Sequence, residues 1–114
     1  MSRRTVIVVD DHAAFRRQAA RLLQAAGWEV VGEAPDGASA VRLAQALRPD
    51  AVMLDVGLPD SSGFEVADAL GSGPDVLLVS SDEDAGELAR ERERAFLWKG
   101  ALSTDALARA LGAA

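Results

Sequence analysis

The chain has 114 residues, the size of about one globular domain, and its 49% hydrophobic and 26% charged residues are ordinary for a protein with one buried core. A formal net charge of −6 argues against direct binding to nucleic acid, which needs a basic surface. The sequence has no cysteine, no secretory signal pattern and no apolar run near the ~18 residues of a membrane span, so we expect no disulfide, no membrane insertion and a cytoplasmic location.

Apolar runs alternate with segments of helical periodicity in the first half of the chain. Val6–Val9 is a run of β-branched residues, which is typical of a strand buried on both faces. Residues 29–34 are predicted to form a weaker strand with two glutamates, and residues 37–47 a helix that ends before Pro49. Between the two strands a first helix is predicted, because apolar side chains recur at helical spacing, at Phe15, Ala19, Leu22, Leu23 and Ala26.

The same alternation continues in the second half of the chain. It predicts two further buried strands, a short last strand and three helices, the last of them capped by a serine. In chain order these elements are Ala51–Leu54, Phe64–Leu70, Val76–Val79, Glu83–Arg92, Ala95–Trp98 and the segment that follows Ser103.

Five strands alternating with five helices predict the α/β class, with a single doubly wound parallel sheet covered by helices on both faces. The second and fifth strands are the weakest and are expected at the edges of the sheet. The flavodoxin-like strand order 2-1-3-4-5 places them there. No internal repeat or linker divides the sequence, so we expect one domain over residues 4–112 and no second domain.

Polar and charged side chains follow the predicted strands where each strand ends. Asp10 and Asp11 come after the first strand, and Asp55 ends the third. Ser80 ends the fourth strand and Lys99 follows the fifth. Because the carboxyl ends of parallel strands meet at one edge of the sheet, where ligands bind in this class of fold, we expect these five side chains to lie together.

This set of side chains suits phosphoryl transfer with a divalent metal. Adjacent carboxylates repel one another, and Mg²⁺ relieves that repulsion while it leaves room for phosphate oxygens. Asp55 is then a candidate nucleophile that forms an aspartyl phosphate. Lys99 is the only lysine among 12 basic residues, which favours a specific role for a compact ammonium at this position.

Four segments of the chain, in this order, resemble the receiver domain of two-component response regulators. The resemblance extends from about Arg4 to Gly112, and the Asp-Asp-His opening is most similar to receivers of the NarL/FixJ type. The four segments are Val8–His12, Leu54–Phe64, Leu78–Ser81 and Phe96–Lys99.

The resemblance implies an acceptor and a metal site. Asp55 accepts a phosphoryl group from a histidine kinase or a phosphotransfer protein. Mg²⁺ is bound directly by Asp11, by Asp55 and by the backbone carbonyl of Gly57, while Asp10 acts mainly through water. The domain is then a switch for a partner-binding or output surface, not a turnover enzyme, with a homodimer formed on phosphorylation among the options.

The resemblance also implies the moving parts of the switch. Ser80 contacts the phosphoryl group and moves toward it, Lys99 pairs with Asp55 or the phosphate, and Phe96 reorients when the hydroxyl moves. Ser81 is the alternative hydroxyl, but the apolar run ends directly before Ser80.

Three features depart from the pattern of the family. Lys99-Gly100 replaces the common Lys-Pro pair. Asp55 and Ser80 are 25 positions apart and Ser80 and Lys99 are 19 apart, both shorter than usual, so we expect a shortened third helix and a short or irregular fourth helix. The alternating run at residues 90–94 is expected to be a solvated helix end.

Other candidate residues have two readings each. His12 is read as a loop residue at the start of the first helix, with metal binding or phosphate relay as the alternative. Trp98 is expected to pack in the core under a neighbouring helix, with a binding anchor as the alternative, and Trp28 is expected to pack at the start of the second strand. Asp60 and Asp82 are expected to cap turns, and Asp82 to tune dephosphorylation in a second reading.

Two other functions compete with the phosphorylated switch. A phosphorylation-independent receiver-like interaction module is the main alternative. A Mg²⁺-dependent phosphohydrolase is disfavoured, because Gly57 stands two residues after Asp55, where such enzymes usually carry a second carboxylate.

Overall fold

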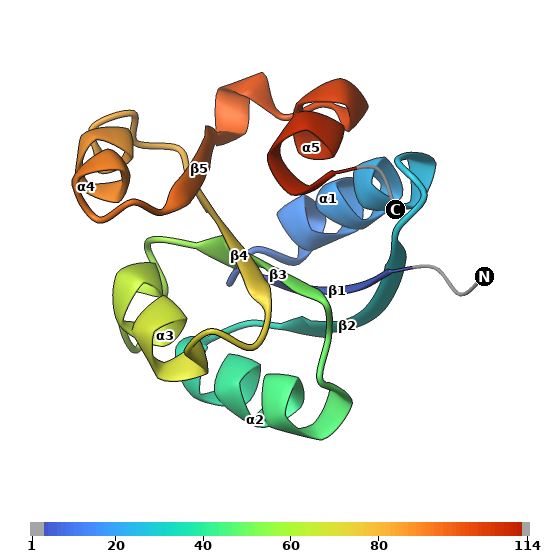
Figure 1. Cartoon of the computed structure of the whole chain (residues 1–114), viewed down its shortest axis with the longest axis horizontal. Coiled ribbons are helices and arrows are strands. Elements are labelled where there is room, and N and C mark those ends of the chain that lie inside the picture. Colours follow the sequence, from blue (N-terminus) through green and yellow to red (C-terminus); the bar gives the residue numbers. More distant parts are fainter. Residues whose placement is uncertain (1–3, 113–114) are drawn as a thin grey trace.

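A computed structural model describes residues 4–112, which form one five-stranded parallel sheet with helices on both faces (Figure 1). The strand order is β2-β1-β3-β4-β5, which confirms the predicted topology. The strands are β1 (Thr5–Val9), β2 (Glu29–Ala34), β3 (Ala51–Asp55), β4 (Asp75–Ser80) and β5 (Ala95–Trp98). The helices are α1 (Ala13–Ala25), α2 (Gly37–Leu47), α3 (Gly63–Leu70), α4 (Ala85–Glu91), the 3₁₀ helix η1 (Lys99–Ala101) and α5 (Thr104–Leu111).

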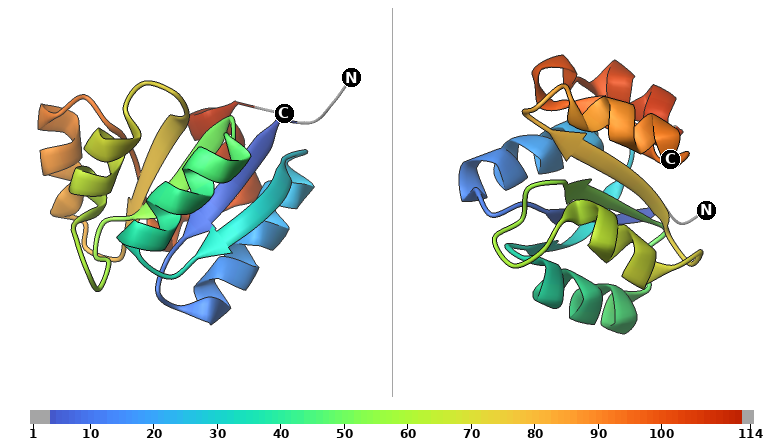
Figure 2. Two further views of the ribbon diagram at one scale, coloured as in Figure 1. Left: turned by 90° about the horizontal axis from the view of Figure 1, so that it is seen from below. Right: turned by 90° about the vertical axis from the view of Figure 1, so that its left-hand side faces the viewer.

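The core has two layers, one on each face of the sheet. Alternate strand residues point to opposite faces, so Ile7 and Val9 belong to the core layer shared with α2, α3 and α4, while Val6 and Val8 belong to the layer shared with α1 and α5. All four valine and isoleucine side chains are at most 1% exposed. Figure 2 shows the helices on the two sides of the sheet. The continuous apolar run of β1 is therefore explained by burial on both faces.

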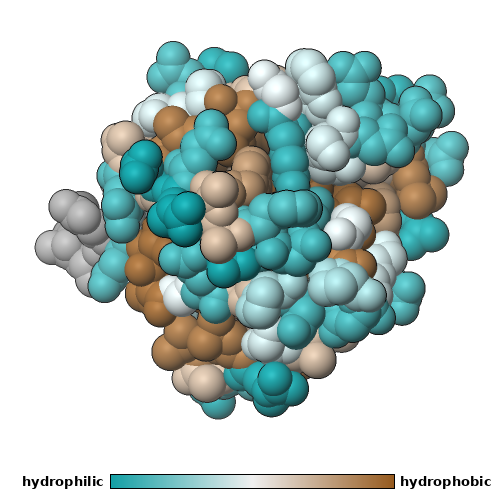
Figure 3. Space-filling view, turned by 180° about the vertical axis from the view of Figure 1, so that it is seen from behind, coloured by the Kyte–Doolittle hydropathy of each residue, from teal (hydrophilic) through white to brown (hydrophobic). Residues whose placement is uncertain are grey.

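The surface is mixed in polarity. Figure 3 shows one face on which hydrophilic residues are interspersed with smaller hydrophobic areas. Three large hydrophobic side chains are more than a third exposed, namely Leu47, Leu88 and Trp98. No helix within residues 4–112 has both the length and the apolar character needed to cross a membrane.

The start of α2 is capped from two places in the sequence. The Asp36 carboxylate accepts a hydrogen bond from the backbone N–H of Ser39 at 2.8 Å. The Asp60 carboxylate, from the loop after β3, accepts from the N–H groups of Gly37 at 2.8 Å and Ala38 at 3.0 Å. These N–H donors hold the pKa of Asp60 below its ordinary value. Asp60 therefore acts as a cap, as predicted, but on a helix that precedes it in the chain.

The helices α3 and α4 have eight and seven residues, against 13 and 11 in α1 and α2, so both are short. The alternating charged run at residues 90–94, which begins in the last turn of α4, was expected to be solvated, but two of its arginines make contacts. Arg94 forms an ion pair with Asp68 of α3 at 2.8 Å, and the Arg92 guanidinium lies 5.0 Å from the ring centroid of Phe64. The run therefore fastens the end of α4 to α3.

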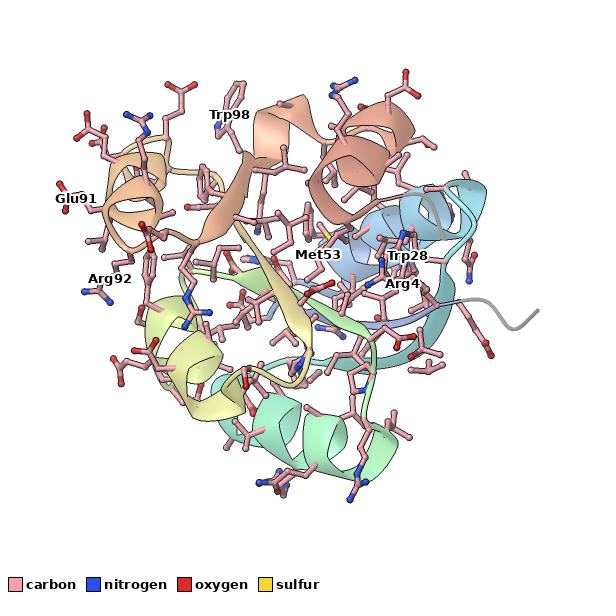
Figure 4. The ribbon with its side chains drawn as sticks, viewed as in Figure 1. Arg4, Trp28, Met53, Glu91, Arg92 and Trp98 are labelled. Carbon is pink, nitrogen blue, oxygen red and sulfur yellow. The ribbon has the colours of Figure 1, made fainter. Side chains whose placement is uncertain are left out.

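The two tryptophans have opposite environments. Trp28 is fully buried just before β2, as predicted, and its Nε1–H donates to the carbonyl of Gly112 at 3.1 Å. Trp98 was expected in the core, and that expectation is wrong, because the residue is 41% exposed. It lies at the end of an edge strand, and its side chain points outward between α4 and η1 (Figure 4).

Gly63 allows the loop after β3 to return directly onto the end of that strand. A Cβ at Gly63 would overlap the carbonyl oxygen of Asp55 and lie 2.8 Å from the Cα of Val56. We predict that Gly63→Ala lowers the free energy of unfolding by about 2 kcal/mol because the backbone has to move apart. Urea denaturation measures the loss. Gly73→Ala is the matched control, since the nearest atom to its added Cβ is 4.0 Å away, and an equal effect in both variants would contradict the prediction.

Candidate functional site

The predicted site residues meet at the carboxyl ends of the central strands. Asp10 directly follows β1, Asp55 ends β3, Ser80 ends β4 and Lys99 follows β5. The Lys99 Nζ lies 2.6 Å from Oδ2 of Asp10 and 3.6 Å from Oδ1 of Asp55. The structure therefore brings an amine from one edge of the sheet against carboxylates from two central strands.

Asp10 is the acid that holds Lys99 most closely. Its side chain is 0% exposed, and its Oδ1 also accepts a hydrogen bond from the backbone N–H of His12 at 2.8 Å. The Lys99 ammonium has a second favourable neighbour, since it lies 4.2 Å from the ring centroid of Phe15. The sequence analysis expected Lys99 to pair with Asp55 or a phosphate, whereas its short contact is with Asp10.

Asp55 is a buried carboxyl among other charges. Its side chain is 8% exposed, and burial is the main cause that raises its pKa above the ordinary value. The negative charge of Asp10 raises the pKa further, while Lys99 and the N–H of Gly57 partly oppose that rise. Asp55 therefore carries a negative charge that its surroundings do not fully compensate.

Asp11 and His12 complete the cluster on its solvent side. The side chains of Asp11 and His12 are 37% and 73% exposed, and His12 Nδ1 lies 3.0 Å from an Asp11 carboxylate oxygen. One ligand atom each from Asp10, Asp11 and His12 lies within 4.8 Å of the other two. His12 directly precedes α1, as the sequence suggested. Its imidazole also contacts the carboxylates of Asp10 and Asp11.

Ser80 and Ser81 differ in burial and contacts. Ser80 is 7% exposed, and its Oγ accepts a hydrogen bond from the backbone N–H of Asp82 at 2.9 Å. Since Oγ is the acceptor there, the hydroxyl hydrogen remains free to be donated elsewhere. Ser81 is exposed. Asp82 in turn accepts from the N–H of Asp84 at 2.9 Å, which confirms that it caps a turn.

Phe96 lies away from the carboxylates. Its ring is half-buried and packs against α4, where a Cβ at Gly86 would be 3.1 Å from the ring atom Cε1. Phe96 pairs with Leu78 in the sheet, two positions before Ser80. Phe96 therefore contacts α4 through its ring and is paired through its backbone with β4, the strand that ends in Ser80.

The donor set fits a hard divalent cation. Three carboxylates, from Asp10, Asp11 and Asp55, stand at one edge of the sheet, and the pKa of Asp55 is raised first by burial and then by the negative charge of Asp10. Gly57 is exposed, and nothing lies within 4 Å of where its side chain would begin, so this side of the site is open. Carboxylate and carbonyl oxygens in an open, partly hydrated position are the ligands that Mg²⁺ prefers.

The family model described as the response regulator receiver domain matches residues 6–108, and the chain belongs to this family. NarL proteins are among its relatives. The chain is 36% identical over 107 residues to the probable transcriptional regulatory protein NarL of Mycobacterium tuberculosis, covering 88% of this chain and 50% of that protein. It is 39% identical over 92 residues to the transcriptional regulatory protein PdtaR of the same organism, covering 77% of this chain and 45% of that protein.

A solved structure agrees with both the fold and the family. The signal receiver domain of the putative response regulator NarL from Mycobacterium tuberculosis superposes with a TM-score of 0.84 at 36% identity, covering 97% of this chain and 94% of the other. The chain spans about half the length of the curated relatives described above.

Removing the charge of Asp55 should stabilise the metal-free protein. A raised pKa means that the folded state loses stability relative to the protonated form as the pH rises from near the ordinary value of 3.8. At neutral pH and in the presence of a chelator, we predict that Asp55→Asn raises the melting temperature by a few degrees. The difference should shrink as the pH falls and vanish below 3.8, where the carboxyl is protonated in both the folded and the unfolded state. A variant less stable than the wild type at neutral pH would contradict this reasoning.

Removing the ammonium of Lys99 should have the opposite effect, because it leaves the buried Asp10 without its counter-charge. We predict that Lys99→Met lowers the free energy of unfolding by roughly 2 kcal/mol, below the usual cost of breaking a buried pair because Asp10 keeps the N–H of His12. Adding Asp10→Asn to that variant should restore much of the loss. If Lys99→Met unfolds at the same denaturant concentration as the wild type, the pair does not stabilise the fold.

Proposed function

We propose that this chain is a receiver domain whose Asp55 accepts a phosphoryl group from a histidine kinase or a phosphotransfer protein. The observation that carries the proposal is the placement of Asp55, which is buried at the end of β3, has a raised pKa and has the ammonium of Lys99 3.6 Å away. Membership of the receiver family supports the same role. The domain spans residues 4–112 and acts as a switch, not as a turnover enzyme.

The chemistry is a displacement at phosphorus. An Asp55 carboxylate oxygen forms the new P–O bond while the bond from phosphorus to the donor nitrogen breaks, and the donor imidazole keeps the electron pair. The ammonium of Lys99 is placed to neutralise charge on the phosphoryl oxygens. In this proposal Ser80, whose Oγ accepts from the N–H of Asp82, donates its hydroxyl hydrogen to one of those oxygens.

Mg²⁺ is the cofactor that this proposal requires. Asp11, Asp55 and the backbone carbonyl of Gly57 would hold it directly, and Asp10 would act through water. When bound, the ion neutralises charge on the acceptor and on the phosphoryl oxygens. Because Lys99 already compensates Asp10 in the metal-free protein, the charges left for the cation are those of Asp11 and Asp55.

The output of the switch is a change in a partner-binding surface. Ser80 moves toward the phosphoryl group, and Phe96, which packs against α4, reorients with it. The named relatives are transcriptional regulators about twice the length of this chain, so a further output domain or a separate partner is the expected recipient of the signal. Formation of a homodimer on phosphorylation is one form that this change can take. The proposal places the protein in the cytoplasm.

Incubation with acetyl phosphate and Mg²⁺ tests the acceptor. Mass spectrometry of the intact protein should show the gain of one phosphoryl group, and peptide mapping after borohydride reduction should place it on Asp55. Asp55→Asn should gain none, and a chelator should abolish labelling of the wild type. Mg²⁺ binding without labelling would contradict the proposal and favour a phosphorylation-independent interaction module.

A further inference from the structure

Trp98 lies between the two loops that follow Ser80 and Lys99. It pairs with Ser80 in the register of β4 and β5, and its Nε1–H donates to the carbonyl of Ser81 at 3.3 Å. The indole is 41% exposed and is directed outward between α4 and η1 (Figure 4). One edge of this ring is therefore bonded to the residue directly after the serine of the site.

The outer end of the same ring covers Gly100. A Cβ on Gly100 would overlap the ring atoms Cζ2, Cζ3 and Cη2 of Trp98, so the ring occupies the space that a side chain would need. Gly100 lies in η1 directly after Lys99, and its φ is not in the left-handed region. A single indole thus touches the residue after Ser80 and the residue after Lys99.

This contact compensates for a local weakness in the sequence. A glycine after Lys99 gives the backbone more freedom than most residues would. Lys99 has to present its ammonium within a site whose other members come from different strands. The Trp98 ring limits that freedom, because Gly100 cannot move toward β5 without striking it.

We propose that Trp98 is a positioning residue that sets the separation of the Ser80 loop and the Lys99 loop, and that its indole moves when a phosphoryl group occupies Asp55. This inference rests on the proposed function. In that proposal Ser80 and Lys99 both contact the phosphoryl oxygens, so their loops are drawn together. The Trp98 ring then changes its contacts with Ser81 and with Gly100. The role is separate from that of Phe96, whose ring packs on Gly86 of α4.

Fluorine NMR of the whole chain labelled with fluorotryptophan tests the movement. The chain has two tryptophans, and Trp98→Phe assigns their signals. On addition of Mg²⁺ and then beryllofluoride, the Trp98 signal should shift, while the signal of the buried Trp28 should stay in place. The fluoride signal of bound beryllofluoride, which Asp55→Asn should abolish, reports independently that Asp55 is occupied.

The two possible failures are distinguishable in this experiment. A bound beryllofluoride signal with an unchanged Trp98 signal would overturn the inference and leave the proposed function intact. The absence of any bound beryllofluoride signal would overturn the proposed function and this inference with it.

Gly100→Ala tests the positioning role, because the added methyl group displaces the Trp98 ring. The backbone at Gly100 has a φ that alanine also adopts, so the substitution does not strain the backbone itself. Gly73→Ala is the matched control, with open space at its added methyl group. We expect Gly100→Ala to weaken beryllofluoride binding roughly two- to ten-fold, the equivalent of one lost hydrogen bond. The Mg²⁺ affinity should stay unchanged, because the metal ligands lie at the ends of β1 and β3 and in the loops that follow them.

Trp98→Phe removes the bond to Ser81 together with the outer ring atoms that cover Gly100, because a phenyl ring does not reach the positions of Cζ2, Cζ3 and Cη2. Its beryllofluoride affinity should fall at least as far as that of Gly100→Ala. Equal beryllofluoride affinities for Gly100→Ala and Gly73→Ala would overturn the inference. An equal loss of Mg²⁺ and beryllofluoride affinity in Gly100→Ala would overturn it as well, because it would show general loosening of the site.

Discussion

The burial of several carboxylates beside one ammonium is the constraint on which the rest of the structure depends. The side chain of Asp10 is 0% exposed and that of Asp55 is 8% exposed, while Asp11 stands at their solvent side. Lys99, the only lysine of the chain, compensates one of these charges and not all of them. A cluster with this residual charge favours a cation and an anion together, which is the combination that Mg²⁺ and a phosphoryl group supply.

The parallel sheet brings this cluster of side chains together, and contacts of the loop after β3 hold that loop close to the sheet. Residues that are 45 and 89 positions from Asp10 in sequence reach it only because β1, β3 and β5 run in the same direction. The loop after β3 returns tightly at Gly63, and Asp60 of that loop binds the start of α2. Both contacts restrain the loop that follows Asp55.

Much of the fold and of the candidate site was predictable from sequence because both follow from local patterns. The β-branched run Val6–Val9 identifies a strand buried on both faces, and the weak second and fifth strands are at the edges, as expected. Asp10, Asp55 and Lys99 come together because each directly follows a strand of one parallel sheet. No contact had to be known in advance for that inference.

The remaining features depend on contacts between distant residues, which periodicity does not reveal. The Nζ atom of Lys99 lies 2.6 Å from the Asp10 carboxylate and 3.6 Å from that of Asp55, a difference of 1.0 Å. Side-chain packing decides so small a difference. Trp98 shares strand β5 with the half-buried Phe96, yet it is exposed at the end of that edge strand. Nothing local to Asp60 indicates that its carboxylate caps α2, more than 20 positions earlier in the chain.

A crystal structure of the chain with Mg²⁺ and beryllofluoride tests the central claim most directly. The account predicts beryllium bonded to a carboxylate oxygen of Asp55, with Mg²⁺ contacting Asp11, Asp55 and the carbonyl of Gly57. It also predicts that the ammonium of Lys99 turns from Asp10 toward a fluorine atom. Beryllofluoride bound to another carboxylate, or an Asp55 that remains free while Lys99 stays on Asp10, would contradict the account.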